Sequence, residues 1–319
     1  MEFLSQIDLP SGLPVVEGGT GANTAAGARD NLGLGNAALA NASPFMCGRL
    51  TLESGTPNKI GDVTGASTLY LAPWRGNTLS IYNGTLWVPY AFPQLSLALS
   101  GLTSGKNYDV FAYDSGGSAV IDLGQDWTND TTRNTAVSLL NGIWVNTSSF
   151  TTKIGGVTVG ANRGTLVGTI RATGTSTTED SAVKRFVSNL WNPLRRHFAR
   201  TDTTGHTYSA NSPVRGWNNA STHTLEWVTC IAQHSVLINF QGAFTSSGAG
   251  TQGARLGLGS ATTVQNLVMD FNGTQIIGDG FPFTVSAQGG YAIYYVTELA
   301  TGSGNSTYYY YSLGGEIWN

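Results

Sequence analysis

Short alternating apolar runs, each closed by turn residues, fill this chain from Trp74 onward. In "TLSIYNGTLWVPYAF" two such runs flank Asn83-Gly84. This pair predicts a β-hairpin, because both positions tolerate a positive φ. The runs "SLALSGL", "NYDVFAYDSG" and "GTLVGTIRATG" keep the same period of two and end at Gly, Asn or Asp. We therefore expect a mainly β chain whose antiparallel strands pack as sandwiches or jelly rolls.

The expected strands fall into two groups, and a chain of 319 residues has room for two domains. We expect a first β domain over residues 74–175 and a C-terminal β domain over residues 200–319. In the second group, "HTLEWVTCIAQ" and "SVLINFQGAF" predict a hairpin around His234. Residues 45–73 predict an extended linker with short strands. The chain shows no fixed-period repeat, which argues against a β-helix.

Residues 176–199 hold the one long helical pattern, "TEDSAVKRFVSNLWNPLRRHF". Its apolar side chains recur at i, i+3, i+4, i+7 and i+8, namely Val183, Phe186, Val187, Leu190 and Trp191. Thr178 is the expected cap of the helix, and Pro193 ends the pattern. We expect this amphipathic helix at the junction of the two β domains, where Phe186, Leu190 and Trp191 would hold subunits together.

A second, shorter helix is expected in "VVEGGTGANTAAGARDNLGL", residues 15–34. The glycines before it allow a tight turn, Thr24 or Asn23 caps the helix, and Gly33 stops it. A phosphate-binding reading fails, because the third glycine of G-x-G-x-x-G is missing and no P-loop motif is present. Isolated helices shorter than about 12 residues are marginal in water, so this one must dock onto something.

The same stretch carries a resemblance to a known family. "EGGTGANTAAGARDNLGLGNAA" resembles a segment repeated in bacteriophage tail-fibre proteins, of the form GGTGA-T-AAGAR-NLGL. "YDVFAYDSG", "WTNDTTRNTA" and "TEDSAVKRFVSNLWN" resemble a module of phage particle proteins. These likenesses cover about the first 190 residues, and the last third resembles no family that we can name.

The resemblance implies that residues 1–44 are a fibre connector or attachment segment in a homotrimer. Other virion proteins would be its partners, and the protein would reside in the virion after assembly in the bacterial host cytoplasm. On this reading, the trimer or attachment contacts fall on small and apolar residues of both expected helices: Gly19, Gly21, Ala25, Ala28, Leu32, Phe186, Leu190 and Trp191.

Composition excludes several partners. Only 11% of residues are charged, the net charge is −3 and the pI is about 5.8. A nucleic-acid-binding chain would show a basic face and an alkaline pI. We expect no signal peptide and no membrane span, because no apolar stretch reaches about 18 residues. Cys47 and Cys230 match no metal spacing and fit a reducing cytoplasm.

No enzyme motif emerges, so we expect no catalytic residue, no cofactor and no metal. Ser181 and Lys184 spell S-x-x-K, but the partner motifs S-D-N and K-T-G are absent. The four histidines form no H-E-x-x-H pattern, and no G-x-S-x-G elbow exists. A glycan-degrading or deacetylating tailspike enzyme stays open as an alternative, because paired carboxylates assemble in space.

Three polar loops are candidates for recognition, over residues 201–223, 245–253 and 300–307, and the first of them supplies the candidate residues. It combines hydrogen-bonding side chains with aromatic rings, as a glycan site would: His206, Tyr208, Arg215, Trp217 and His223. We therefore expect a tail-fibre component that recognises a host surface polysaccharide through its C-terminal domain. The alternative is a purely structural head fibre, decoration or baseplate protein, in which the same aromatic residues serve core or trimer packing.

Overall fold

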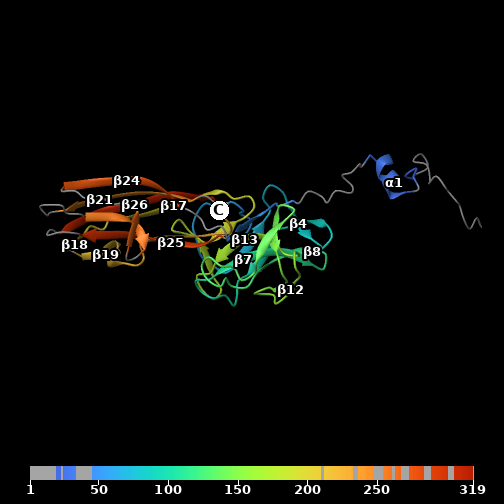
Figure 1. Ribbon diagram of the computed structural model, residues 1–319, viewed down its shortest axis with the longest axis horizontal. Helices are drawn as coiled ribbons and strands as arrows, with labels where there is room; N and C mark the ends of the chain where they lie inside the picture. The colour runs from blue at the N-terminus through green and yellow to red at the C-terminus, as the bar shows by residue number, and fades with distance from the viewer. Residues whose placement is uncertain are drawn as a thin grey trace, which may run out of the picture.

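The computed structural model describes residues 19–22, 24–33, 45–209, 212–232, 236–246, 254–260, 263–266, 273–283, 289–300 and 305–318. The described chain is mainly β, as the alternating runs predict. Its elements are the helix α1 (Ala25–Asn31), a short 3-10 turn η3 (Trp217–Asn219), and strands gathered in two lobes that follow one another along the long axis (Figure 1).

The first lobe contains two main sheets and two hairpins. One sheet has the order β1-β3-β6, from Arg49–Thr51, Thr68–Ala72 and Leu95–Ala98. The larger sheet has the order β8-β7-β13-β10-β9, from Ser118–Leu123, Asn107–Ser115, Thr165–Arg171, Ile143–Asn146 and Val137–Leu140, and β16 (Val187–Asn189) also pairs with β13. The hairpins are β4 (Thr78–Tyr82) with β5 (Trp87–Ala91), and β11 (Phe150–Thr151) with β12 (Thr158–Val159).

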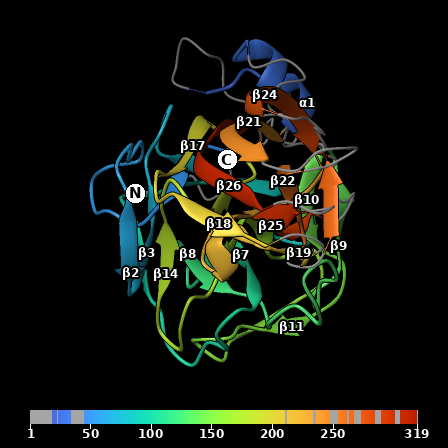
Figure 2. The ribbon, with the colours of Figure 1, turned by 90° about the vertical axis from the view of Figure 1, so that its left-hand side faces the viewer.

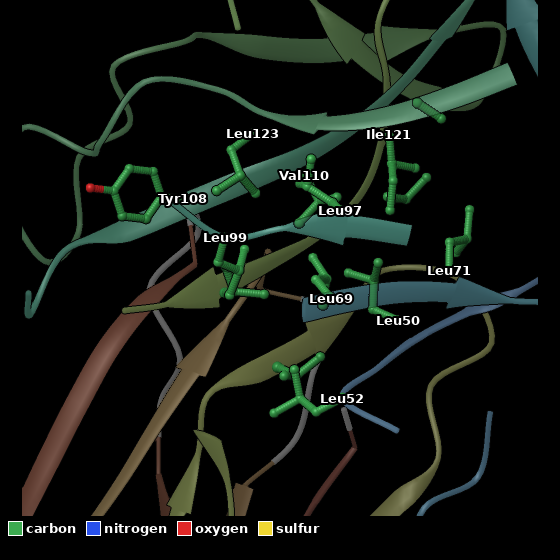
Figure 3. Packing of buried hydrophobic residues seen from close by; sticks show 14 of the residues in the cluster. Leu50, Leu52, Leu69, Leu71, Leu97, Leu99, Tyr108, Val110, Ile121 and Leu123 are labelled. Atoms are coloured by element: carbon green, nitrogen blue, oxygen red, sulfur yellow. The ribbon is translucent and has the colours of Figure 1, made fainter. Parts of the chain in front are cut away.

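Strands β7 and β13 form the centre of this lobe, since both faces of β13 and most of β7 are buried. On one face, leucines of β1, β3 and β6 pack against Val110, Ile121 and Leu123 (Figure 3). On the other face lies a second cluster that includes Phe111 and Leu166. Residues 45–73 do supply the expected short strands. They are not a linker, because Leu50, like its neighbours in β3, lies in this core.

The Asn83-Gly84 hairpin is confirmed. β4 pairs with β5 in the register Tyr82↔Trp87, so the turn spans four residues. Gly84 has a φ of +95°, and the Asn83 side chain accepts hydrogen bonds from the backbone N–H groups of Thr85 and Leu86, both at 2.9 Å. Local turn chemistry therefore fixes this hairpin, as the sequence predicts.

The prediction of an amphipathic helix over residues 176–199 is wrong. The segment forms β14 (Thr178–Asp180), β15 (Lys184–Arg185) and β16 instead. Every residue from 185 to 190 is buried, including Ser188 and Asn189. A run buried on all sides suits a strand between two layers, whereas a surface helix needs a polar face. Tertiary pairing with β13 thus overrides a pattern that also matches a helical period.

The C-terminal lobe is built from two sheets that enclose a shared core. One has the order β17-β26-β21-β24, from Arg195–Asp202, Ser306–Trp318, Val236–Ser246 and Gly273–Phe283, and β18 (His206–Tyr208) also pairs with β26. The facing strands are β20 (Thr224–Thr229), β25 (Gly290–Ala300), β22 (Ala254–Ser260) and β23 (Thr263–Asn266), and β19 (Ser212–Gly216) also pairs with β25. Aromatic side chains from both sheets fill the space between them. This arrangement matches the expected sandwich.

The prediction of a hairpin around His234 is wrong. β20 pairs with β15 and β25, whereas β21 pairs with β24 and β26, so the chain crosses from one sheet to the other there. Residues 233–235, which contain His234, lie outside the described residues. Two alternating runs in succession do not by themselves specify pairing, because a chain can turn back or change sheets between them.

One sheet joins the two lobes. It runs from β2 (Val63–Ala66) through β14 and β15 to β20 and β25, and the β15–β20 step is parallel. The half-buried carboxylate of Asp180 anchors this junction, because it pairs with Arg185 at 3.2 Å and with Arg196 at 2.8 Å. The segment expected to separate the lobes therefore ties them together.

Candidate functional site

The N-terminal helix has the expected local structure. Thr24 caps α1 by accepting a hydrogen bond from the Gly27 N–H at 3.0 Å, and Gly33 follows the helix with a φ of +67°. Leu32 is 55% exposed and Ala28 is half-buried. The apolar face of α1 is therefore open to a partner, and Figure 1 shows α1 standing away from the sheets.

The glycines before α1 also take part in its structure. Gly21 adopts a φ of +64°, which a residue with a Cβ adopts only at a cost. The Asn31 side chain donates a hydrogen bond to the Thr20 carbonyl oxygen at 2.8 Å, so the turn folds back on the helix. Gly19 is half-buried in this turn, and the side chain of Ala25 lies outside the described residues.

The three residues expected to join subunits through a helix, Phe186, Leu190 and Trp191, instead pack inside their own chain. Phe186 makes an edge contact with Tyr291, with ring centroids 6.1 Å apart. Leu190 is 4% exposed in the Phe111 cluster, and the Trp191 indole donates to the Leu166 carbonyl oxygen at 2.8 Å. No sister chain is needed to cover these side chains.

The five loop residues singled out for recognition do come together, around a buried carboxylate of β25. Glu298 is fully buried. Arg215 Nε donates to its Oε1 at 2.5 Å, and His206 Nε2 contacts its Oε2. The Arg215 guanidinium also lies over the Tyr208 ring, 3.6 Å from the centroid. Strands β18 and β19 thus bring His206 and Arg215 into contact with the carboxylate that β25 carries.

Trp217 is the aromatic centre of the cluster. Its ring meets His206 edge-on at 4.7 Å and Tyr311 edge-on at 5.0 Å, measured between centroids. Tyr308 stacks on His206 at 5.4 Å. Trp217, Tyr308 and Tyr311 are all fully buried. They form the buried layer beneath the loops. The exposed surface of the cluster comes from His206, Tyr208, Arg215 and His223.

The inward positions of Tyr308 and Tyr311 depend on an irregularity in β26. Tyr310 pairs with Ala243 but Tyr308 pairs with Phe244, so Tyr309 is an extra residue in the strand. Without this step, residues three apart in a strand would point to opposite faces. Tyr309 is 44% exposed as a result.

His223 closes the other end of the cluster. Its Nδ1 lies 2.6 Å from the Tyr311 hydroxyl and 3.7 Å from Asp202 Oδ2. Burial, together with the charge of Arg200, holds the pKa of His223 below its usual value. The imidazole is therefore mainly neutral near pH 7 and takes part in the network as a hydrogen-bonding group.

The surface of the cluster lies at the tip of the C-terminal lobe. β18 and β19 mark the end of the molecule farthest from the first lobe (Figure 1), and they stand in front when the molecule is viewed along its long axis (Figure 2). His206, Tyr208, Arg215 and His223 are partly exposed there. Glu298 was the residue whose role the sequence did not reveal. Its only signal is one carboxylate inside the apolar run "YAIYYVTELA".

Neither a metal site nor a membrane-spanning helix is found among the residues that the structure describes. No group of three or more His, Cys, Asp or Glu side chains in the part of the chain that the structure describes comes together as metal ligands would. Within those same ranges, the helices are too short or too polar to cross a membrane. The Glu298 cluster thus remains the candidate site for recognition.

No protein-family model matches the chain, and no curated protein matches it in sequence. Among solved structures, the chain is similar to a chain in the structure of the infectious bursal disease virus Gx strain. The TM-score is 0.25 and the sequence identity is 14%, over 85% of this chain and 69% of that one. For T=1 particles derived from infectious bursal virus, the TM-score is 0.29 and the identity is 11%, over 88% of this chain and 72% of that one.

A third similar structure is the insecticidal delta-endotoxin Cry8Ea1 from Bacillus thuringiensis. Its TM-score is 0.19 and its identity is 7%, over 84% of this chain and 51% of that one. Likenesses this distant do not establish a shared fold. The function proposed below rests on residues of this chain.

Proposed function

We propose that this chain is a bacteriophage virion fibre protein, a homotrimeric tail-fibre component that recognises a host surface glycan through its C-terminal lobe. The observation that carries the proposal is the N-terminal segment. The stretch that resembles phage fibre connectors folds as a capped helix of seven residues, Ala25–Asn31, with Leu32 exposed beside it. Such a helix has too little surface to be stable alone, so docking against sister chains or another virion protein explains its preserved caps.

Trimer formation is the first expected result. Light scattering of the purified full chain should give three times the 33.5 kDa of one chain. Leu32→Asp should lower the trimer fraction at least tenfold, because it places a carboxylate in the proposed helix contact. Leu139→Asp is the matched control, since Leu139 is 56% exposed in β9 and lies outside the segment. A full chain that stays monomeric at micromolar concentration would overturn the trimer.

The layout of the lobes supports recognition at the tip. The chain enters the first lobe near residue 45, and β18 and β19, which carry His206, Tyr208 and Arg215, lie at the far end of the other lobe (Figure 1). Attachment at one end and recognition at the other suits a fibre. The buried network also holds the partly exposed Tyr208 and Arg215 in a fixed geometry, which reduces the entropy lost on binding.

Tyr208→Ala should reduce binding of the full chain to host cells at least tenfold. Tyr208 donates a hydrogen bond to the Pro213 carbonyl oxygen at 2.7 Å and forms the ring under Arg215, so its loss removes an aromatic anchor at the tip. Tyr70→Ala, a half-buried tyrosine of β3 in the first lobe, is the control. The full chain is used because β15 pairs with β20 across the lobes.

The two alternatives predict other results in the same assays. A purely structural head fibre, decoration or baseplate protein would bind the particle and show no difference between the Tyr208 and Tyr70 variants on cells. A tailspike enzyme would shorten or deacetylate host polysaccharide during incubation with the wild-type chain. Electron microscopy of labelled particles would give the position of the protein on the virion.

A further inference from the structure

The first lobe contains a cleft of about 210 Å³. Segments far apart in the sequence line it: Tyr82 comes from β4, Tyr90 from β5, Tyr113 from β7, and Arg163 from the turn before β13. Its lining shares no residue with the Glu298 cluster, which belongs to the other lobe. Ligand sites commonly combine aromatic walls with a few convergent polar groups, and this cleft has that composition.

The tyrosines of the cleft are held in place by neighbours. Tyr82 packs on Trp87 with ring centroids 5.5 Å apart, and the side chain of Tyr113 is buried. Burial, together with the negative charge of Asp114, raises the pKa of Tyr90. The Tyr90 hydroxyl therefore stays protonated and can donate a hydrogen bond to a ligand. These contacts preform the walls before any ligand enters.

Two polar groups of the cleft keep unused hydrogen-bonding capacity. Asn83 uses its Oδ1 for the turn, where it accepts from two backbone N–H groups, so its NH₂ can still donate. Asp114 accepts a hydrogen bond from the Gly117 N–H at 2.9 Å through Oδ1. A carboxylate offers about four acceptor positions, so a ligand hydroxyl can still bind there.

Arg163 is exposed, and no described carboxylate pairs with its guanidinium. Its Nη2 lies directly against Gly84, where a Cβ would collide with it. The glycine turn of the β4–β5 hairpin therefore makes room for this guanidinium at the cleft. A guanidinium that lies at a cleft without a carboxylate partner can bind an anionic group of a ligand. Its planar arrangement of N–H donors matches the two oxygens of a carboxylate.

We propose that this cleft binds a single pyranose unit that carries a carboxylate, as in a uronic acid. The volume has room for one sugar ring, and the tyrosine rings offer apolar surface to its C–H face. Asn83 and Asp114 face its hydroxyls, and Arg163 pairs with its carboxylate. This site is independent of the proposed recognition at the C-terminal tip, and soluble sugars test it without cells or particles.

The test is a calorimetric titration of the full chain with D-glucuronate, D-glucose and acetate as probes. The first two share a ring and differ at C6, and acetate supplies a carboxylate without a ring. Glucuronate should bind about tenfold more tightly than glucose, the factor expected from one charge-assisted pair. Arg163→Gln should reduce glucuronate affinity to that of glucose. Arg75→Gln is the control, because Arg75 is exposed and lies outside the cleft lining.

A second variant tests the hydroxyl of a cleft tyrosine. Tyr90→Phe keeps the aromatic wall but removes a hydroxyl that can donate to a ligand, and it should weaken the binding of both sugars by a similar factor. Arg163 is exposed, so its replacement should leave the circular dichroism spectrum and melting temperature unchanged. The proposal is overturned if acetate binds as tightly as glucuronate, if the Arg163 and Arg75 variants bind glucuronate alike, or if neither sugar binds at tens of millimolar concentration.

Discussion

Glu298→Ala is expected to lower the free energy of unfolding by about 3 kcal/mol, which is the low end for breaking a buried ion pair from one side. Glu298 has no exposed surface, and both Arg215 and His206 contact its carboxylate. Removing it leaves the Arg215 charge partly buried without a counter-charge and removes the acceptor of His206. Urea unfolding followed by circular dichroism measures the change.

Glu316→Ala is the matched control for this prediction. Glu316 is also a β-strand carboxylate with an arginine and a histidine nearby, Arg195 and His197, but both of those side chains are more than half exposed. Exposed ion pairs contribute little, so this variant should unfold close to the wild type. Equal unfolding of the two variants would show that the Glu298 network contributes no more than a surface pair.

Gly315→Ala is expected to destabilise the C-terminal lobe by about 2 kcal/mol, the usual range for overpacking a core. Gly315 lies in β26 between β17 and β21. A Cβ built there would lie 2.9 Å from Ile238 Cα and closer still to the Leu237 carbonyl oxygen. The obstacle is backbone on the neighbouring strand, so no side-chain rotation relieves the clash.

The neighbouring residue provides an internal control. Gly314 has the same strand neighbours, yet a Cβ there would meet no atom within 4 Å. Gly314→Ala should leave stability unchanged or raise it slightly, because alanine restricts the unfolded chain more than glycine does. Thermal unfolding of the two single variants compares them directly. If they melt together, the packing of β21 against β26 is looser than described.

Features that depend on near neighbours in the chain could be predicted from the amino-acid sequence. The caps of α1 at Thr24 and Gly33 follow from local hydrogen bonds and a positive φ. The β4–β5 hairpin follows from Asn83-Gly84. The alternating runs predicted the mainly β class, because apolar residues that recur at every second position between closely spaced turns indicate β-strands.

Strand pairing, and the choice of which strand faces are buried, depend on contacts between residues that are distant in the chain. Residues 185–190 match a helical stripe in sequence, but they lie between two packed layers, where contacts with β13 and the C-terminal lobe outweigh local preference. The skipped pairing at Tyr309 turns Tyr308 and Tyr311 inward. Glu298 joins His206 and Arg215 across about 90 residues of chain. Each outcome depends on partners distant in sequence, and a local pattern carries no information about them.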